Sequence, residues 1–316
     1  MPKVSVVIPS YNCASSVCNA VESVFAQTMQ DFEIILVDDG STDNTRAVLG
    51  PYFSNPKFRY IHQQNRGAPG ARNTGSRASN AEYLAFLDAD DLLSPRALEL
   101  MAGKLDTSHA SWCLIDPVRI RLDHTALRRT TIPQGDLLLG ILKDDFVGRC
   151  MFFRRTDFIE VGMFDETLRC LEDWDINIRM FEQQKPFAYL DLPVYTYIWR
   201  QGSLITDQRK MAAHTEQMLR KNHKRLADGG DREVAKIYAQ AMWDLARRYW
   251  YGVRDYKRAL ACVGESLAYD FSLTRLLHPL IHKWQRRRAQ GSLAHSLADV
   301  RAKELESQPR KAVPSE

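Results

Sequence analysis

The sequence of 316 residues has no long hydrophobic run. No window approaches the roughly 18 uninterrupted apolar residues that a membrane-spanning helix requires. The apolar stretch within residues 1–12 is also far too short for a signal peptide or a membrane span. We therefore expect a cytoplasmic protein that is either soluble or bound peripherally to the cytoplasmic face of the membrane.

Cysteine is scarce and scattered. The six cysteines stand at positions 13, 18, 113, 150, 170 and 262, with no C-x-x-C pair and no cluster of Cys and His. This pattern suggests neither a zinc site nor a disulfide framework. Reduced thiols in a cytoplasmic protein are the simplest interpretation.

Two common nucleotide-binding fingerprints are also missing. The P-loop pattern G-x-x-x-x-G-K-[ST] is absent, and G-x-G-x-x-G does not follow the first apolar segment. Both patterns place backbone N–H groups around phosphates, so their absence argues against an ATPase and against an NAD-dependent enzyme.

Apolar segments alternate with helical periodicity along the first ninety residues. Strands are expected at 4–9, 32–41, 58–63 and 83–88, and helices at 14–27, 41–49 and 75–81. This alternation is typical of a doubly wound α/β domain. In such domains ligands bind beyond the carboxyl ends of the strands, and the acidic clusters of this sequence fall there.

The second half of the chain changes character. Residues 97–200 mix helices with strands, whereas the pattern beyond Thr206 is wholly helical. Helices are expected at 207–228, 231–250, 255–269 and 272–289. We predict an α/β domain at 1–206, a helical region at 207–305 and a disordered tail at 306–316.

Three carboxylates follow the apolar segment YLAFL, in the order DADD. If the strand continues through them, Asp88 and Asp90 share one face, because alternate residues of a strand do. Two carboxylates suit a hard cation such as Mg²⁺ or Mn²⁺, completed by substrate phosphates. An alternative is that Asp90 or Asp91 caps the helix that follows.

A second cluster, VDDGSTDNT, follows the strand at 32–41. Asp39 is a candidate acceptor for a base N–H or a ribose hydroxyl, although a turn with Asx and Ser/Thr caps is the alternative. After the first strand and Pro9, Tyr11 offers a ring on which a base could stack. The glycine-rich stretch GAPGARNTG carries one cation, Arg72, which could meet a diphosphate.

The third acidic constellation is CLEDWDINIRM at 170–180. Asp173 is a candidate general base for removing a proton from an acceptor hydroxyl. Glu172 and Trp174 flank it and are candidates for contact with the acceptor, the indole offering a flat apolar surface. The alternative is that these acids only cap a helix, since carboxylates are favourable at helix N-termini.

Taken together, these motifs resemble a family 2 glycosyltransferase of the GT-A fold. The motifs that carry the resemblance are VSVVIPSYN, FEIILVDDGSTDNT, NRGAPGARNTG, YLAFLDADD, GMFDE and EDWD, in the family's order and at its usual spacing. They run from Val4 to about Asp175, and the resemblance extends to roughly Ile205. It implies an enzyme that inverts the anomeric centre by a single displacement, without a covalent sugar intermediate.

The resemblance assigns roles to individual positions. Pro9, through its backbone, and Tyr11 would contact the nucleobase, and Asp39 would accept its N–H. The remaining assignments are Arg72 near the nucleotide, Asp88 near ribose or diphosphate, Asp90 on the Mn²⁺ or Mg²⁺ ion, and Asp173 as the base. By family frequency the resemblance favours a UDP-sugar as donor, with GDP- and dTDP-sugars as alternatives. It implies hexosyl or N-acetylhexosaminyl transfer to a glycan or lipid-linked acceptor in cell-envelope polysaccharide synthesis.

The sequence departs from the family in two places. The Q-x-x-R-W element of processive, membrane-embedded members is absent, which favours transfer of one sugar at a time. Many relatives have His where this chain has Gln201, so a third protein ligand to the metal is not identified.

The C-terminal part is basic. Residues 281–316 contain eight Lys and Arg against four Asp and Glu, which equals the net charge of +4 of the whole chain. The segment HPLIHKWQRRR at 278–288 could lie on an anionic membrane, or it could be a solvated face or an oligomer contact. No nucleic-acid-binding motif accompanies the charge, so nucleic acid is not expected as a partner. A nucleotidyltransferase and a non-catalytic nucleotide-sugar-binding scaffold are the alternative functions.

Overall fold

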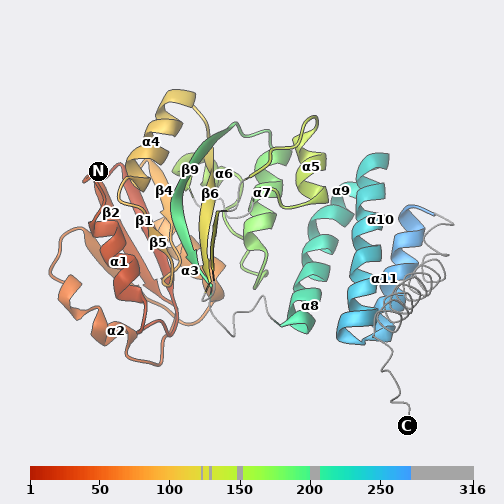
Figure 1. Cartoon of the computed structure of the whole chain (residues 1–316), viewed down its shortest axis with the longest axis horizontal. Coiled ribbons are helices and arrows are strands. Elements are labelled where there is room, and N and C mark those ends of the chain that lie inside the picture. Colours follow the sequence, from red (N-terminus) through yellow and green to blue (C-terminus); the bar gives the residue numbers. More distant parts are fainter. Residues whose placement is uncertain (122–123, 128–129, 148–151, 200–206, 272–316) are drawn as a thin grey trace, which may run out of the picture. The chain divides into compact units, whose positions relative to one another are not determined.

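A mixed sheet of nine strands organises the computed structural model, which describes residues 1–121, 124–127, 130–147, 152–199 and 207–271 (Figure 1). The sheet order is β3-β2-β1-β4-β8-β6-β9-β5, and β7 pairs with β6. The strands are β1 (Val4–Ser10), β2 (Phe32–Asp38), β3 (Phe58–His62), β4 (Tyr83–Phe86), β5 (Leu92–Leu93), β6 (Trp112–Arg121), β7 (His124–Leu127), β8 (Phe152–Arg154) and β9 (Phe187–Ile198). The first four in sheet order run parallel, and β8 then pairs antiparallel with β4.

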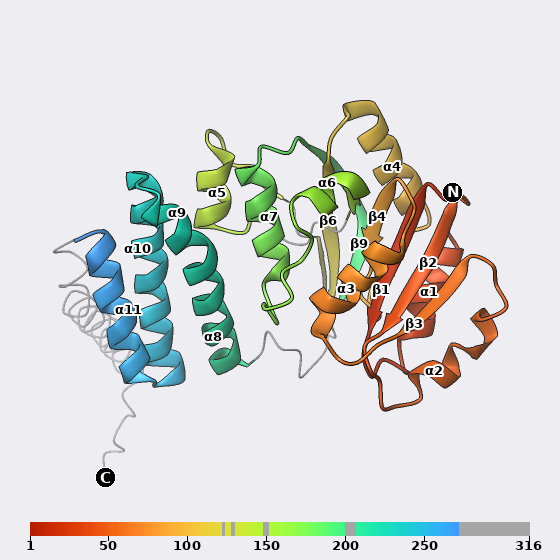
Figure 2. The same ribbon diagram turned by 180° about the vertical axis from the view of Figure 1, so that it is seen from behind.

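Helices cover both faces of this sheet (Figures 1 and 2). The helices of the α/β part are α1 (Val17–Phe25), α2 (Thr45–Val48), η1 (Gly50–Tyr52), α3 (Gly67–Ala78), α4 (Ala97–Ser108), α5 (Leu137–Lys143), α6 (Arg155–Glu160) and α7 (Glu172–Glu182). Ile34 and Leu36 of β2 pack in one core with α1 and α4, whereas Ile35 and Val37 pack against Ala71 of α3. Alternate residues of one strand therefore supply the two cores, as its near-continuous apolar sequence requires.

Helix α3 begins earlier than predicted. The helix expected at 75–81 spans Gly67–Ala78 and includes the whole glycine-rich stretch GAPGARNTG. A β-carbon at Gly75 would lie only 2.3 Å from Cγ1 of Val7 in β1, so glycine is required by the close approach of helix and strand. The helix expected at 41–49 shrinks to the four residues of α2.

Beyond Asp207 the described chain is helical, as predicted. The elements are α8 (Gln208–Leu219), the π-helical segment η3 (Arg220–Lys224), α9 (Arg225–Asp228), α10 (Arg232–Arg247), the π-helical segment η4 (Arg248–Val253) and α11 (Tyr256–Tyr269). A hydrophobic core runs from Phe86 and Trp112 in the sheet, through α5 and α7, to Met218, Tyr238 and Cys262 in these helices. Met1–Tyr269 accordingly form one compact unit.

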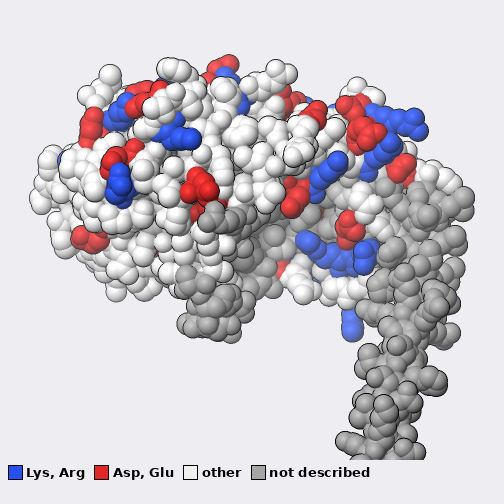
Figure 3. All heavy atoms as spheres, turned by 45° about the horizontal axis from the view of Figure 1, so that its top comes forward, with Lys and Arg blue, Asp and Glu red and all other residues white. Residues whose placement is uncertain are grey.

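Several predictions concern residues outside the described ranges. These are the helix at 272–289, the basic segment at 278–288, the tail at 306–316 and the side chain of Gln201. The domain boundary at 206/207 likewise stays a prediction. Among the described helices, none has the length and apolar character needed to cross a membrane. On the face shown in Figure 3, the described Lys and Arg side chains are mixed with Asp and Glu.

Candidate active site

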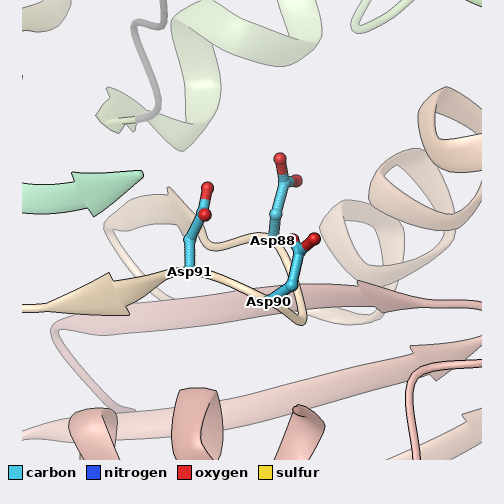
Figure 4. A group of neighbouring side chains, drawn as sticks. All are labelled: Asp88, Asp90 and Asp91. Atoms are coloured by element: carbon cyan, nitrogen blue, oxygen red, sulfur yellow. The ribbon is translucent and has the colours of Figure 1, made fainter. Parts of the chain in front are cut away.

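The acidic turn (residues 88–91) lies just beyond the carboxyl end of β4. The strand ends at Phe86, and the backbone N–H of Asp91 donates to the carbonyl of Asp88 at 3.0 Å. The carboxylates of Asp88, Asp90 and Asp91 point to the same side, with one oxygen of each within 4.8 Å of the others (Figure 4). The prediction that these acids meet is confirmed, but its reason was wrong, because a turn and not strand alternation brings them together.

Asp91 differs from its two neighbours. It is fully buried and accepts hydrogen bonds from the Tyr195 hydroxyl at 2.6 Å and from the backbone N–H of Ile198 at 2.9 Å. Asp91 therefore fixes the end of β9 beside the turn. The helix-cap alternative is wrong for these acids, because α4 begins only at Ala97 and its N-cap is Arg96.

The chemistry of the acidic turn suits a divalent cation. Mg²⁺ and Mn²⁺ take oxygen ligands, commonly one or two carboxylates plus phosphate oxygens of a substrate. Both oxygens of Asp91 accept hydrogen bonds that hold β9, and Oδ1 of Asp88 accepts from Arg72. Asp90, together with the second oxygen of Asp88, would hold such an ion, since both residues are only partly buried.

Arg72 joins the acidic turn to helix α7. It is 3% exposed; its Nη2 donates to Oδ1 of Asp88 and its Nη1 to Oε1 of Glu172, both at 2.6 Å. Burial by itself would lower the pKa of Arg72, but the two carboxylates raise it above its ordinary value, so the side chain stays a cation. Its position near the candidate site agrees with the sequence, and direct contact with a diphosphate stays a prediction.

The residues of the EDWD motif begin helix α7. Leu171, the N-cap, has a left-handed φ of 63° and contributes no capping side chain. Glu172 binds Arg72, and a carboxylate oxygen of Asp173 accepts from the backbone N–H of Trp174 at 2.9 Å. The motif is therefore at a helix start, as predicted, with Glu172 directed toward the acidic turn through Arg72.

The indole of Trp174 is anchored rather than freely mobile. Its Nε1–H donates to the carbonyl of Ile141 at 2.8 Å, and its ring meets the ring of His223 edge to face at 5.7 Å. The side chain is partly buried against the hydrophobic core. A role in acceptor contact stays a prediction, and any such contact would use a fixed ring.

Asp39 holds the start of helix α3. Its carboxylate accepts from the backbone N–H groups of Arg66 at 2.9 Å and Gly67 at 2.7 Å, and from Nε2 of Gln63 at 2.7 Å. This is anion binding at a helix N-terminus, where unpaired N–H groups and the helix dipole favour negative charge. Recognition of a base by Asp39 stays a prediction that must be compatible with these bonds.

Its neighbour Asp38 is also buried. Burial raises the pKa of Asp38, but hydrogen bonds from Ser41 and Tyr60 outweigh this effect and leave the pKa below its ordinary value. The bond from the Ser41 N–H to Asp38, at 2.8 Å, is the Asx-type turn that was the alternative interpretation of this cluster.

Two loops at the same sheet edge are joined by side chains. Asn12, with a φ of 53°, accepts from the backbone N–H groups of Thr42 at 2.8 Å and Asp43 at 3.3 Å. The preceding residue, Tyr11, is 49% exposed, whereas Pro9 is buried inside β1. An exposed ring on a loop held in this way is accessible to a base. Stacking of Tyr11 on the nucleobase stays a prediction.

Sequence reasoning missed one buried group near the site. Asp175 is fully buried and accepts bonds from Arg179, Lys221 and Asn222. The acid itself was visible in the motif, but no local signal identifies partners that lie 46 and 47 residues away.

Comparison with known proteins agrees with this arrangement. The family described as "Glycosyl transferase family 2" matches residues 5–162. An uncharacterized glycosyltransferase of Rickettsia bellii is 38% identical over 231 residues, covering 68% of this chain and 32% of the relative. The chondroitin synthase of Escherichia coli is 44% identical over 101 residues, covering 32% of this chain and 15% of that protein. The chain thus spans about a third or less of the length of these curated relatives.

The fold is similar to that of solved structures of S. aureus TarS. The structure of TarS 1-349 in complex with UDP-GlcNAc has a TM-score of 0.60 at 17% identity, covering 88% of this chain and 92% of that chain. The predicted fold, a Rossmann-like GT-A domain followed by a helical region, is confirmed. Since the family match covers half of the sequence, from β1 to α6, the chain belongs to glycosyltransferase family 2.

Proposed function

We propose that this protein is a metal-dependent inverting glycosyltransferase. It moves one sugar from a nucleotide-diphospho-sugar to a hydroxyl group of a glycan or lipid-linked acceptor. The observation that carries the proposal is the acidic turn, where three carboxylates meet within 4.8 Å at the carboxyl edge of the sheet. Membership of glycosyltransferase family 2 supports sugar transfer as the reaction and argues against the alternative of a nucleotidyltransferase.

The reaction needs a base on the acceptor side, and Asp173 has that role in the proposal. It takes the proton of the acceptor hydroxyl, whose oxygen bonds to the anomeric carbon. The bond from that carbon to the diphosphate breaks, and the nucleoside diphosphate leaves with the electron pair. A cation held by Asp90, with Asp88 near the ribose or the diphosphate, would neutralise the negative charge on this leaving group. Glu172 and Trp174 contact the acceptor.

A UDP-sugar is the favoured donor. The TarS structures similar in fold contain UDP and UDP-GlcNAc. In the proposed mode Tyr11 stacks on the base, Asp39 and the backbone of Pro9 contact its polar edge, and Arg72 stays beneath the diphosphate. The exposed ring of Tyr11 and the position of Asp39 at the same sheet edge support this mode.

Location and partners follow from the remaining predictions. We place the protein in the cytoplasm, with peripheral membrane contact through residues 278–288 if its acceptor is lipid-linked, and with no nucleic acid as partner. Envelope polysaccharide synthesis would supply such an acceptor. The helical region from 207 to 305 would serve acceptor, membrane or oligomer contacts.

Thermal unfolding with UDP, GDP and dTDP, each with and without Mn²⁺, tests donor binding. A ligand that binds only the folded state raises the free energy of unfolding, by about 2.7 kcal/mol at a hundredfold excess over Kd. The thermal midpoint rises as a result. We expect a rise with UDP that needs Mn²⁺ and is lost in Asp90→Asn. The exposed Asp244→Asn is the control and keeps the rise. No shift with any nucleotide would refute donor binding and would mean that the acidic turn has only a structural role.

Transfer itself tests the base. Asp173→Asn should lower the rate of nucleotide release in the presence of acceptor by about 10²–10⁴-fold, because general base catalysis is worth that much. The midpoint shift with UDP and Mn²⁺ should persist in this variant. An unchanged transfer rate would refute the assignment of Asp173.

A further inference from the structure

Helix α7 begins without a cap of its own. Its N-cap is Leu171, an apolar residue with positive φ that offers no side-chain acceptor. A polar N-cap commonly stabilises a helix, and this helix lacks one at the turn that carries Asp173. The position of that turn must therefore be set by contacts with the rest of the protein.

Two anchors flank Asp173 in sequence. On one side Glu172 is bound by Arg72 at 2.6 Å, which ties it to the acidic turn. On the other side Asp175 is fully buried and accepts at both carboxylate oxygens. Oδ2 accepts from Arg179 of the same helix at 2.7 Å, and Oδ1 accepts from Lys221 at 2.6 Å.

The second anchor comes from the helical region. Besides Lys221, Asn222 donates to the same oxygen of Asp175 at 2.7 Å. Next in sequence, His223 packs its ring against Trp174 and bonds through Nε2 with the carbonyl of Leu142 at 2.8 Å. Three consecutive residues of η3 thus contact α7 or α5.

Lys221, Asn222 and His223 lie in the π-helical segment η3, between α8 and α9 at Arg220–Lys224. Single π-helical turns inside helices occur frequently at functional sites.

The same contacts extend to the loop before α7. Lys221 also binds Asp165 at 2.6 Å, and Arg179 donates to the carbonyls of Val161 and Met163 at 2.5 and 2.6 Å. One charged network therefore fixes both the loop at 161–165 and the first turn of α7. Burying a carboxylate completely is unfavourable unless its hydrogen bonds are met, so Asp175 holds its neighbours in one arrangement.

We propose that Asp175, Lys221 and Asn222 are positioning residues for the reaction, so that the helical region belongs to the catalytic unit. They act through the first turn of α7 and touch neither donor nor acceptor. The proposal rests on the proposed function, in which that turn carries the base. It predicts that weakening the network lowers kcat while leaving the binding of the donor nucleotide unchanged, because the acidic turn is held by other contacts.

The test compares Lys221→Met with Arg225→Met. Arg225 also links the helical region to α7, through a bidentate pair with Glu182 at 2.9 and 2.6 Å, but at the far end of the helix. Lys221 is 35% exposed, so its replacement is compatible with folding. We expect Lys221→Met to lower kcat about tenfold or more, with the KM for the donor within twofold, and Arg225→Met to change neither.

Further variants separate positioning from loss of folded protein. Asp175→Asn and Asn222→Leu should lower kcat in the same way, measured per folded molecule by circular dichroism and by the UDP-dependent rise of the unfolding midpoint. Lys221→Arg, which keeps the charge, should recover part of the rate. The proposal is overturned if Lys221→Met retains full kcat, or if Arg225→Met loses as much.

The two proposals can fail separately. If Asp173→Asn transfers sugar at the normal rate, the assigned base is wrong and the positioning inference falls with it. If Asp173→Asn is inactive but Lys221→Met and Asn222→Leu keep the full rate, only the positioning inference is wrong. In that case the network serves stability alone.

Discussion

Replacing Arg72 by Met should destabilise the protein strongly, although it removes only one charge. The variant keeps an apolar stem of similar length but leaves two carboxylates without their cation. The side chains of Asp88 and Glu172 are only 17% and 13% exposed, so water compensates their charge poorly. Breaking a buried ion pair by removing one partner costs about 3–5 kcal/mol. Because both acids keep some contact with water, we expect Arg72→Met to lower the free energy of unfolding by about 2–3 kcal/mol.

Urea unfolding followed by circular dichroism measures this loss. The midpoint should fall while the slope with denaturant stays constant, since the folded state keeps its extent. At about 2–4 °C per kcal/mol, the thermal midpoint should drop by about 5–10 °C. The control is Arg96→Met, whose partner is Glu99 and whose pair is 61% and 45% exposed. It should cost about 0.5 kcal/mol or less.

An equal loss in the two variants would refute the reasoning. It would mean that the two carboxylates beside Arg72 are hydrated or protonated when the guanidinium is gone. The ion pairs of Arg72 with Asp88 and Glu172 would then stabilise the protein no more than a surface ion pair does.

Two other predictions concern packing and pH. Gly75→Ala should lower the free energy of unfolding by about 1–3 kcal/mol in urea, because the new β-carbon would meet Val7 at 2.3 Å; a change below 0.5 kcal/mol would contradict the close contact. Burial lowers the pKa of His223 to about 4, below its ordinary value of 6.5. Between these values the unfolded chain binds more protons than the folded one, so stability should fall by about 2–3 kcal/mol as the pH drops from 6.5 to 4. His223→Gln should show a weaker dependence over this range, and an identical slope would count against a buried neutral imidazole.

Much of the sheet could be predicted from sequence because its signals are local. The strands that became β1 to β4 are short apolar runs, each followed by polar turn residues, and their order fixes a parallel arrangement. Asp88 and Asp90 were found for the same reason, since a carboxylate pair after a buried strand is unusual in itself. The start of helix α3 was misplaced, because glycine disfavours a helix interior and the predicted helix began only at residue 75. Gly75 instead allows the helix to approach Val7 closely.

The connections within the site could not be predicted, because they join residues that are distant in sequence. Arg72 and Glu172 are 100 residues apart, and nothing near either of them identifies the other. Asp39 was predicted to bind a base or a ribose hydroxyl, whereas its bonds to Arg66 and Gly67 could not be predicted, because the helix was expected to begin at residue 75 and not at Gly67. Asp175 belongs to an acidic motif that could have been only a helix cap. Its partner Lys221 comes from the helical region and could not be predicted from the motif.

The hydrophobic core that passes from the sheet into α8, α10 and α11 bears on how hybrid enzymes of this family could be built. A catalytic domain joined to another member's C-terminal region at 206/207 would present the apolar surfaces of α5 and α7 to foreign helices. The residues of α5 and α7 that pack against α8 and α10 would have to be exchanged together with the helical region, while β8 and β9 keep their pairing with β4 and β6. Acceptor preference would then be inherited along with the helix that bears the proposed base.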